Sequence, residues 1–115
     1  MSQRATSPEE LETLLEDACL VGDLDALAGL FDAAAVLGHA DRCRPASGRG
    51  EVVQVLNALR ADGVSYLARR SVVVQGGSLA LIINGTAVHV VRRSNRGWHY
   101  LISWLDSDWA RRGEA

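Results

Sequence analysis

Lysine is absent from the 115-residue chain, and all 12 basic residues are arginine. This absence excludes Schiff-base catalysis by lysine, and also the phosphate-binding loops and protein kinases that depend on one. Cysteine is scarce: Cys19 and Cys43 have the spacing of neither a metal site nor a disulfide framework, so we expect a reducing cytoplasm. No apolar run approaches ~18 residues, and residues 1–10 lack the apolar segment of a signal peptide.

The composition is that of an ordinary globular protein. Hydrophobic residues make up 48% of the sequence, charged residues 23%, and the formal net charge is −2. This balance creates no field that would attract nucleic acid, and the arginine pairs are too scattered along the chain to form a binding groove. We therefore expect one domain over residues 1–115, with neither a nucleic-acid partner nor a membrane partner.

The first half of the sequence is predicted to be mainly helical. Three segments have apolar residues at helical spacing: residues 7–22, 24–31 and 51–62. Ser7 is a suitable N-cap for the first of them, and Gly22 is a suitable stop. Asp23 is placed to cap the second helix, so the two helices follow each other with almost no linker.

The remaining segments have the composition and turn signals of strands. They are residues 33–43, 65–75, 78–83, 86–93 and 98–106. Gly76-Gly77 and Asn84-Gly85 are typical of tight hairpin turns, and residues 94–97 are predicted to form a third turn. Helices separated from an antiparallel sheet indicate an α+β fold, in which one face of the sheet packs on the helices.

Four short sequences mark the joints between these elements. They are Gly22-Asp23-Leu24-Asp25, Phe31 ahead of the first strand, Gly48-Arg49 ahead of the third helix, and Gly97-Trp98 at the start of the last strand. With the order of the elements, they resemble the nuclear transport factor 2-like superfamily over about residues 8–106. That superfamily includes ketosteroid isomerases, SnoaL-like polyketide cyclases, scytalone dehydratases and limonene epoxide hydrolases. The resemblance implies a cone: a curved antiparallel sheet wrapped around the N-terminal helices, with a pocket at the open end.

Alignment with ketosteroid isomerase implies where a catalytic site would lie. The general-base aspartate of that family falls on His39, its hydrogen-bonding carboxylic acid on His89, and its oxyanion-binding tyrosine on Leu15. The resemblance thus implies an acid–base site in which His39 takes a proton and neutral His89 donates a hydrogen bond to the developing oxyanion. Asp41 either forms a turn or orients His39 through a hydrogen bond.

The register of the last two strands predicts the wall of the pocket. If residues 94–97 form a loop, Arg93 pairs with Trp98 and His89 lies opposite Ile102. Alternate residues of a strand share a face, so His89 is expected among aromatic and apolar side chains. We expect the ligand-binding residues to be Trp98, Tyr100, Ile102 and Trp104 on this face, Arg69 two hairpins away, and Leu15 from the alignment. If the register of these two strands slipped by one residue, His99 instead of His89 would face the pocket.

Two other interpretations of the histidines stay open. Each histidine can be a buried residue that bonds a backbone group or water and has no chemical role. Alternatively, His39, Asp41, Cys43 and His89 are metal ligands, although Pro45 indicates that the chain has already turned into a loop there. We favour a site without metal or cofactor.

The sequence and the resemblance together lead to two functional hypotheses. The first is a cofactor-independent acid–base enzyme (an isomerase, cyclase or dehydratase) acting on a small hydrophobic metabolite, with a natural-product pathway as the setting that the family suggests. The second is a non-catalytic module of the same fold that binds a small molecule or dimerises. A homodimer is expected in either case, from the half-apolar outer face of the sheet and the habit of the family.

Overall fold

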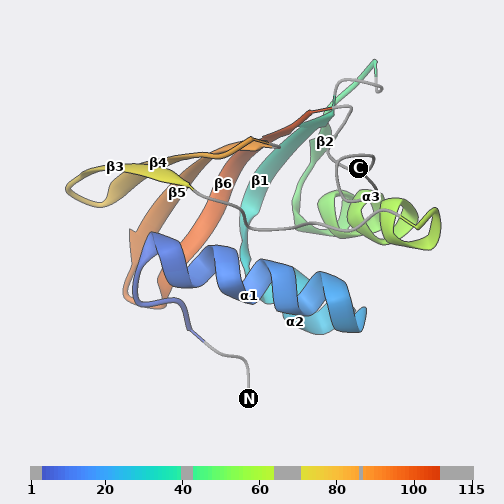
Figure 1. Ribbon diagram of the computed structural model, residues 1–115, viewed down its shortest axis with the longest axis horizontal. Helices are drawn as coiled ribbons and strands as arrows, with labels where there is room; N and C mark the ends of the chain where they lie inside the picture. Colours follow the sequence, from blue (N-terminus) through green and yellow to red (C-terminus); the bar gives the residue numbers. More distant parts are fainter. Residues whose placement is uncertain (1–3, 40–42, 64–70, 86, 107–115) are drawn as a thin grey trace.

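The computed structural model describes residues 4–39, 43–63, 71–85 and 87–106. The elements are α1 (Pro8–Val21), α2 (Leu24–Gly29), β1 (Phe31–His39), β2 (Ala46–Ser47), α3 (Arg49–Ala61), β3 (Val72–Gly76), β4 (Leu79–Ile83), β5 (Ala87–Ser94) and β6 (Gly97–Leu105). Figure 1 shows all three helices on one side of a curved sheet. Within these described ranges, no helix has the length and apolar character needed to cross a membrane.

Helix α1 forms where the sequence predicts it, because both of its ends are capped. The Ser7 hydroxyl accepts the backbone N–H of Glu10 at 3.1 Å, and Gly22 ends the helix with a left-handed φ of 77°. The side of the helix that faces the sheet is apolar except for one carboxylate. Its buried residues are Pro8, Leu11, Glu12, Leu15 and Ala18.

The sheet is open, with strand order β2-β1-β6-β5-β4-β3. The predicted α+β architecture is confirmed, but the prediction of a wholly antiparallel sheet is wrong, because β1 pairs with β6 in the parallel direction. The chain passes through β2, α3 and the hairpin strands before β6 comes to lie beside β1, so no hairpin reverses the direction between these two strands. The core lies between the inner face of the sheet and the helices, and includes Leu11, Leu27, Phe31, Leu37, Val52, Ile82 and Tyr100.

Two boundaries differ from the sequence prediction. Phe31 begins β1 rather than ending the second helix, and it is 1% exposed at the base of the sheet. The turn between β3 and β4 is Gly77–Ser78, one residue later than expected, because Gly76 still pairs with Leu79. Residues 64–70, at the start of the predicted strand 65–75, lie outside the described residues.

A β-bulge between β5 and β6 shifts the register of the sheet at one point. Arg93 pairs with Trp98 as predicted, and Val91 pairs with Tyr100. The next pair is Val90 with Ile102, so Leu101 is an extra residue on β6. Beyond it, Ser103 rather than Ile102 lies opposite His89.

The bulge turns two predicted pocket residues away from the interior. Ile102 is 50% exposed and Trp104 is 53% exposed, so the prediction that they share the face of His89 is wrong. The physical reason is that one extra residue exchanges the faces of all the residues that follow it. Trp104 packs instead over Gly38 on the outer face, where a Cβ atom on that glycine would lie 2.4 Å from the indole Cε3.

Candidate functional site

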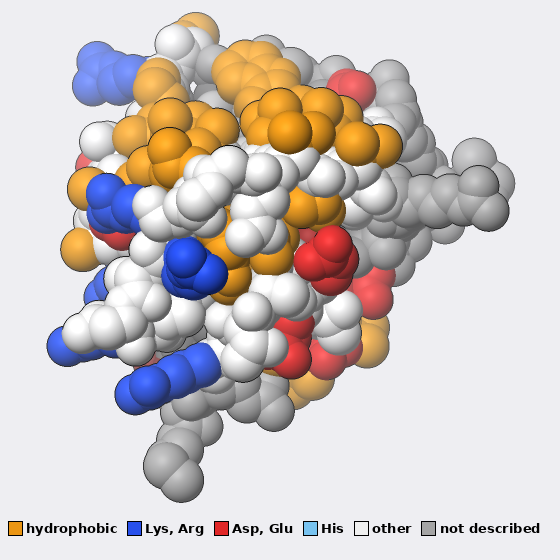
Figure 2. Space-filling model, turned by 90° about the vertical axis from the view of Figure 1, so that its left-hand side faces the viewer, with side chains coloured by type: hydrophobic (Ala, Val, Ile, Leu, Met, Phe, Trp, Pro, Cys, Tyr) orange, Lys and Arg blue, Asp and Glu red, His pale blue; other side chains and the backbone are white. Residues whose placement is uncertain are grey.

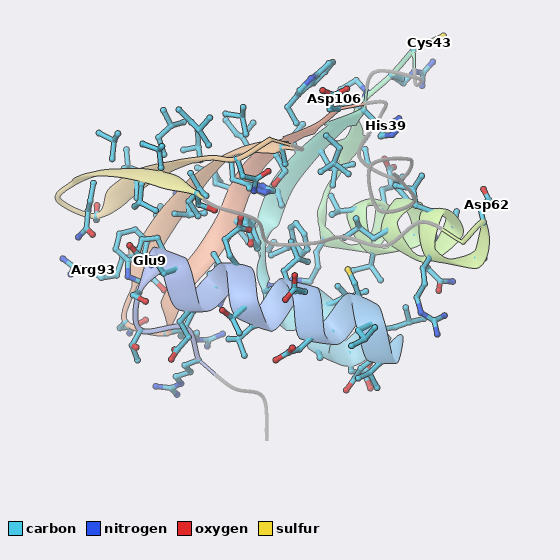
Figure 3. All side chains as sticks on the ribbon, viewed as in Figure 1. Glu9, His39, Cys43, Asp62, Arg93 and Asp106 are labelled. Carbon is cyan, nitrogen blue, oxygen red and sulfur yellow. The ribbon has the colours of Figure 1, made fainter. Side chains whose placement is uncertain are left out.

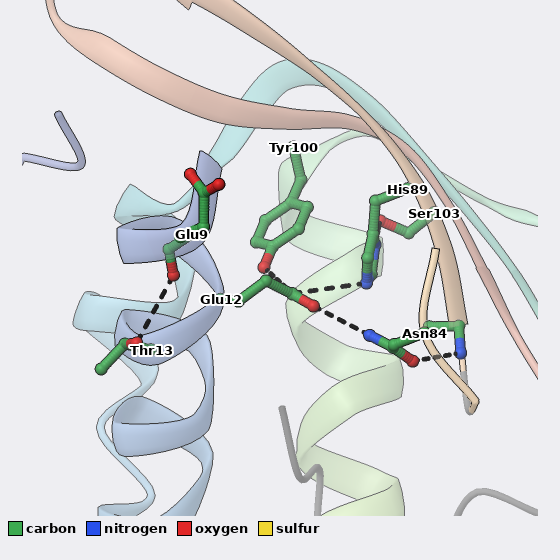
Figure 4. Close-up of polar contacts among 8 residues, drawn as sticks. Glu9, Glu12, Thr13, Asn84, His89, Tyr100 and Ser103 are labelled. Atoms are coloured by element: carbon green, nitrogen blue, oxygen red, sulfur yellow. Dashed lines mark hydrogen bonds and ion pairs between the residues drawn. The ribbon is translucent and has the colours of Figure 1, made fainter. Parts of the chain in front are cut away.

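A cluster of polar side chains lies inside the cone, between α1 and the inner face of the sheet. The Tyr100 hydroxyl donates to Glu12 Oε2 at 2.5 Å. His89 Nε2 lies 3.6 Å from the same oxygen, and His89 Nδ1 lies 2.7 Å from Ser103 Oγ. Figure 4 shows how Glu12 reaches from α1 toward Tyr100 on β6 and His89 on β5. The site therefore joins a carboxylate, a phenol and an imidazole from three elements.

The three central side chains are almost completely removed from solvent. Glu12 is 3% exposed, His89 is 1% exposed, and Tyr100 has no exposed surface. Burial of a carboxylate in an apolar interior is costly unless hydrogen bonds replace its water. The aromatic rings of Phe31 and His89 enclose Tyr100, with centroids 5.1 Å and 4.6 Å from its own. Packing therefore fixes the position of the phenol that Glu12 needs as a donor.

Asn84, in the connection between β4 and β5, holds the other oxygen of Glu12. Its Nδ2 donates to Glu12 Oε1 at 2.8 Å, and its Oδ1 accepts the backbone N–H of Ala87 at 2.8 Å. Because a backbone N–H can only donate, the oxygen of the amide must face Ala87, and the amide nitrogen must face the carboxylate. Each oxygen of Glu12 thus has a donor of its own.

Burial lowers the pKa of His89 from 6.5 to about 3. The imidazole is therefore neutral over the physiological pH range. Glu12 Oε2 lies 3.6 Å from Nε2, beyond hydrogen-bond length, and the cost of burying a charge here outweighs its attraction. A neutral imidazole has one N–H and one free nitrogen, and it can donate a proton or a hydrogen bond without bringing a net charge into the site.

The structure brings five of the predicted site residues into the interior, of which His39 lies apart from the others. His89 and Tyr100 belong to the polar cluster, while Trp98 and Leu15 are 3% and 2% exposed in the core beside it. Asp41 and Arg69 lie outside the described residues. The catalytic and ligand-binding roles assigned to these residues stay predictions.

His39 lies at the C-terminal end of β1 and is 6% exposed. It pairs with Leu105, whereas Leu37 pairs with Ser103, the residue opposite His89. Both histidines therefore face the inner side of the sheet, on strands that β6 separates. They belong to neighbouring rows of paired residues, one that joins Leu37, Ser103 and His89 across the strands and one that joins His39, Leu105 and Ala87. Figure 3 shows His39 near the edge of the sheet where β1 ends. Cys43 is exposed, and among the described residues no group of three histidine, cysteine or acidic side chains is arranged to hold a metal ion.

Sequence reasoning missed Glu12, Asn84 and Ser103. Glu12 did leave a signal, because it occupies a position at helical spacing inside the apolar stripe of α1, four residues after Pro8 and three before Leu15. Asn84 was interpreted only as a turn residue. Ser103 could not be found by alternation along β6, because the bulge changes its face.

Solved structures of several bacterial proteins have the same architecture at low sequence identity. A protein with a cystatin-like fold from Novosphingobium aromaticivorans, described as nuclear transport factor 2-like, is 21% identical, with a TM-score of 0.70 over 90% of this chain and 84% of that one. A ketosteroid isomerase-like protein from Erwinia carotovora atroseptica is 18% identical, with a TM-score of 0.69 over 85% and 91% of the two chains. The chain has the nuclear transport factor 2-like fold.

A third structure with this fold is a candidate dehydratase from Streptomyces avermitilis, which is 22% identical, with a TM-score of 0.69 over 84% of this chain and 90% of that one. No protein-family model and no curated protein matches the sequence. The nuclear transport factor 2-like fold accounts for the position of the polar cluster, since the sheet curves around α1 and directs inward-facing side chains at that helix.

The depressed pKa of His89 predicts that the folded state loses stability as the pH falls. Between pH 6.5 and about 3, the unfolded chain binds a proton on this residue and the folded chain does not. The stabilisation is complete above pH 6.5 and decreases by about 1.4 kcal/mol per pH unit below it. Urea denaturation of wild type and His89→Gln at pH 7.5, 6.5, 5.5 and 5.0 measures this slope.

The stability advantage of wild type over His89→Gln is expected to shrink by about 2 kcal/mol between pH 6.5 and 5.0. Val91→Ala is a matched control, because Val91 lies on the same strand as His89 and pairs with Tyr100 on β6. This variant loses packing but retains the imidazole, so the difference between its free energy of unfolding and that of wild type should not change with pH. An equal pH dependence in wild type and His89→Gln would contradict the assignment of a neutral, buried His89.

Proposed function

We propose that the protein is a cofactor-independent acid–base enzyme that acts on a small hydrophobic molecule. The observation that carries the proposal is the contact of the buried Glu12 carboxylate with the Tyr100 hydroxyl. The same carboxylate oxygen lies 3.6 Å from Nε2 of the neutral His89 imidazole. A base, a hydroxyl donor and an imidazole donor within one apolar interior are the groups that proton transfer at carbon requires. Buried titratable groups with shifted pKa values gather at functional sites more often than elsewhere.

The contacts suggest a role for each group. Glu12 Oε2 removes a proton from the carbon next to a carbonyl group. The electron pair of the C–H bond forms a C=C bond, and the π pair of the carbonyl moves onto its oxygen. Tyr100, released as the carboxylate is neutralised, donates its O–H to that oxygen, and His89 Nε2–H is a second donor. Return of the proton from Glu12 to another carbon completes an isomerisation, whereas its transfer to a β-hydroxyl group, which then leaves as water, completes a dehydration.

The comparisons support the same class of reaction. Two of the solved structures are described as ketosteroid isomerase-like and as a candidate dehydratase. Identities near 20% carry the fold to this chain but not the substrate. A role in natural-product metabolism is therefore proposed by analogy of fold alone.

His39 remains a second candidate for the base. It is buried on the same face of the sheet as His89, although it belongs to the neighbouring row of paired residues. We place Glu12 first because its contacts with Tyr100 and its approach to His89 join the base to its donors. The alternative of a non-catalytic binding module predicts instead that neither residue is needed for any proton transfer.

Proton exchange at carbon tests the enzyme proposal without knowledge of the natural substrate. 2-Tetralone, 2-cyclohexen-1-one and cyclohexanone are incubated with the protein in D2O, and the loss of their α-proton signals is followed by ¹H NMR. Wild type is expected to exchange at least one ketone faster than buffer alone does, and Glu12→Gln is expected to lower that rate about 100-fold or more, because the amide is not a base. Tyr100→Phe is expected to lower it by a smaller factor.

His39→Gln is the matched control, since it also replaces a buried base on the inner face. Equal exchange in wild type and Glu12→Gln would overturn the role of Glu12, and loss of exchange only in His39→Gln would transfer the role to His39. No exchange above buffer with any of the three ketones would reject the enzyme in favour of the binding module. Thermal melting of every variant establishes that the loss does not arise from unfolding.

We also propose that the protein forms a homodimer through the outer face of the sheet. The register places Trp104, Val88, Ile83 and Val72 in one row across four strands, and Ile102, Val90, Leu81 and Val74 in the next. Val72 and Val74 are 61% and 59% exposed, and Ile102 and Trp104 are half exposed. Figure 2 shows hydrophobic side chains gathered along the top of the molecule, the side on which Figure 1 shows the outer face.

The size and charge of this outer face fit a second copy of the chain. Four strands about 4.8 Å apart and two rows about 7 Å apart give a contiguous apolar patch of roughly 270 Å² in projection, which approaches the few hundred Å² at which exposed apolar patches mark an interface. The Arg92 guanidinium at one end already pairs with Asp32, so this arginine brings no unbalanced charge to the described part of the face. A shallow depression of about 230 Å³ beside Val74, Leu81 and Val90 can receive an apolar side chain of a second copy.

Charge placed on the outer face is expected to separate the dimer. Trp104→Glu should elute with the mass of one chain in size-exclusion chromatography with light scattering, whereas wild type should have twice that mass. Leu20→Glu is the matched control, because Leu20 is equally apolar and 77% exposed but lies on α1, away from the sheet. A monomeric wild type would contradict the proposed dimer, and a dimer that resists Trp104→Glu but dissociates in Leu20→Glu would move the interface to α1.

A further inference from the structure

The two nitrogens of the His89 ring have different neighbours. Nδ1 lies 2.7 Å from Ser103 Oγ, and Nε2 faces Glu12 Oε2 at 3.6 Å. A neutral imidazole carries its single proton on one of these nitrogens, and the hydrogen bond made by the other nitrogen decides which one. The Ser103 hydroxyl can donate to Nδ1 or accept from it, so it can hold the tautomer that the neighbours of Nε2 favour.

The donors around Glu12 determine the direction of that selection. Glu12 accepts a hydrogen bond from Tyr100 on one oxygen and from Asn84 on the other. A Nε2 lone pair aimed at this carboxylate would be repelled, whereas a Nε2–H would be attracted. The proton belongs on Nε2, so Nδ1 is the acceptor and the Ser103 hydroxyl is its donor.

We propose that Ser103 is a positioning residue that holds His89 in the Nε2–H tautomer, with its N–H directed at the Glu12 carboxylate. The use of this N–H in a reaction rests on the proposed function, but the tautomer does not. In the opposite tautomer, the ring would present a lone pair to the oxygen of a bound carbonyl compound and would oppose the negative charge that develops there. Ser103 would thus select ligands with an acceptor oxygen at Nε2.

The β-bulge at Leu101 supplies this hydroxyl. Regular alternation after Tyr100 would bring Ile102 opposite His89, and that side chain has no donor. With the extra residue, Ser103 is 2% exposed and faces the imidazole, while Ile102 goes to the outer face. Bulges beside functional sites commonly redirect a side chain in this way.

Histidine tautomers are measured directly by long-range ¹H–¹⁵N correlation spectra of the full chain labelled with [¹⁵N]histidine, recorded at pH 7.5 without ligand. The chain has three histidines, and the signals that disappear in His89→Gln belong to His89. Wild type is expected to show one N–H, on Nε2, with the Nδ1 shift of an accepting nitrogen. Ser103→Ala is expected to move the Nδ1 and Nε2 shifts toward each other, as both tautomers become populated, and Ser103→Thr to restore the wild-type pattern by supplying a hydroxyl again.

A Nδ1–H tautomer in wild type overturns the proposal by itself, whether or not any variant folds. An unchanged Nε2–H pattern in Ser103→Ala also overturns it, because the serine would then have only a packing role. The spectrum requires no substrate, so the absence of ketone exchange would reject the enzyme and leave the tautomer assignment standing. Conversely, exchange that depends on Glu12 together with a Nδ1–H His89 would reject the role of Ser103 alone.

Discussion

One extra residue in β6, Leu101, determines what the interior and the outer surface of the sheet contain. In a regular strand, Tyr100 and Ser103 would face opposite sides, because side chains alternate. The bulge between Val90 and Val91 brings both of them inside, where Tyr100 reaches Glu12 and Ser103 reaches His89. The same shift directs Ile102 and Trp104 to the outer face, so the polar interior and the apolar exterior have one structural cause.

The buried carboxylate is the second constraint, and it is met by distant parts of the chain. Its donors come from Tyr100 on β6 and from Asn84, 72 residues away in sequence. Loss of one of them would remove a hydrogen bond from a buried acceptor, which costs about 1–3 kcal/mol, and more when the group is charged. Such a cluster contributes less to stability than an apolar core of the same volume would. Its presence in a chain of 115 residues therefore favours a chemical role.

Much of the fold could be predicted from local signals in the sequence. Ser7 and Gly22 define α1 through capping, and the pair Arg93–Trp98 follows from a short loop at residues 94–97. These features depend on a few neighbouring residues, so sequence reasoning can reach them. The parallel pairing of β1 with β6 depends on how the whole chain is arranged in space, and no local pattern contains it.

The candidate site could be predicted only in part, for two physical reasons. His89, Tyr100, Trp98 and Leu15 were placed inside correctly. Trp98 and Tyr100 precede the extra residue on β6, His89 lies on β5, which has no extra residue, and Leu15 lies on a helix with a regular period. Ile102 and Trp104 lie beyond the bulge, where alternation fails. Glu12 was overlooked because a charged residue on a helix normally faces solvent, although its spacing within the apolar stripe indicates burial.

The ionisation state of Glu12 tests the central claim most directly, because a base must be a carboxylate before the substrate arrives. Infrared difference spectra between wild type and Glu12→Gln, with and without ¹³C labelling of glutamate, isolate the vibrations of this one group at pH 7. The account predicts the antisymmetric stretch of an ionised carboxylate that receives strong hydrogen bonds. The C=O stretch of a protonated carboxylic acid in its place would contradict the account.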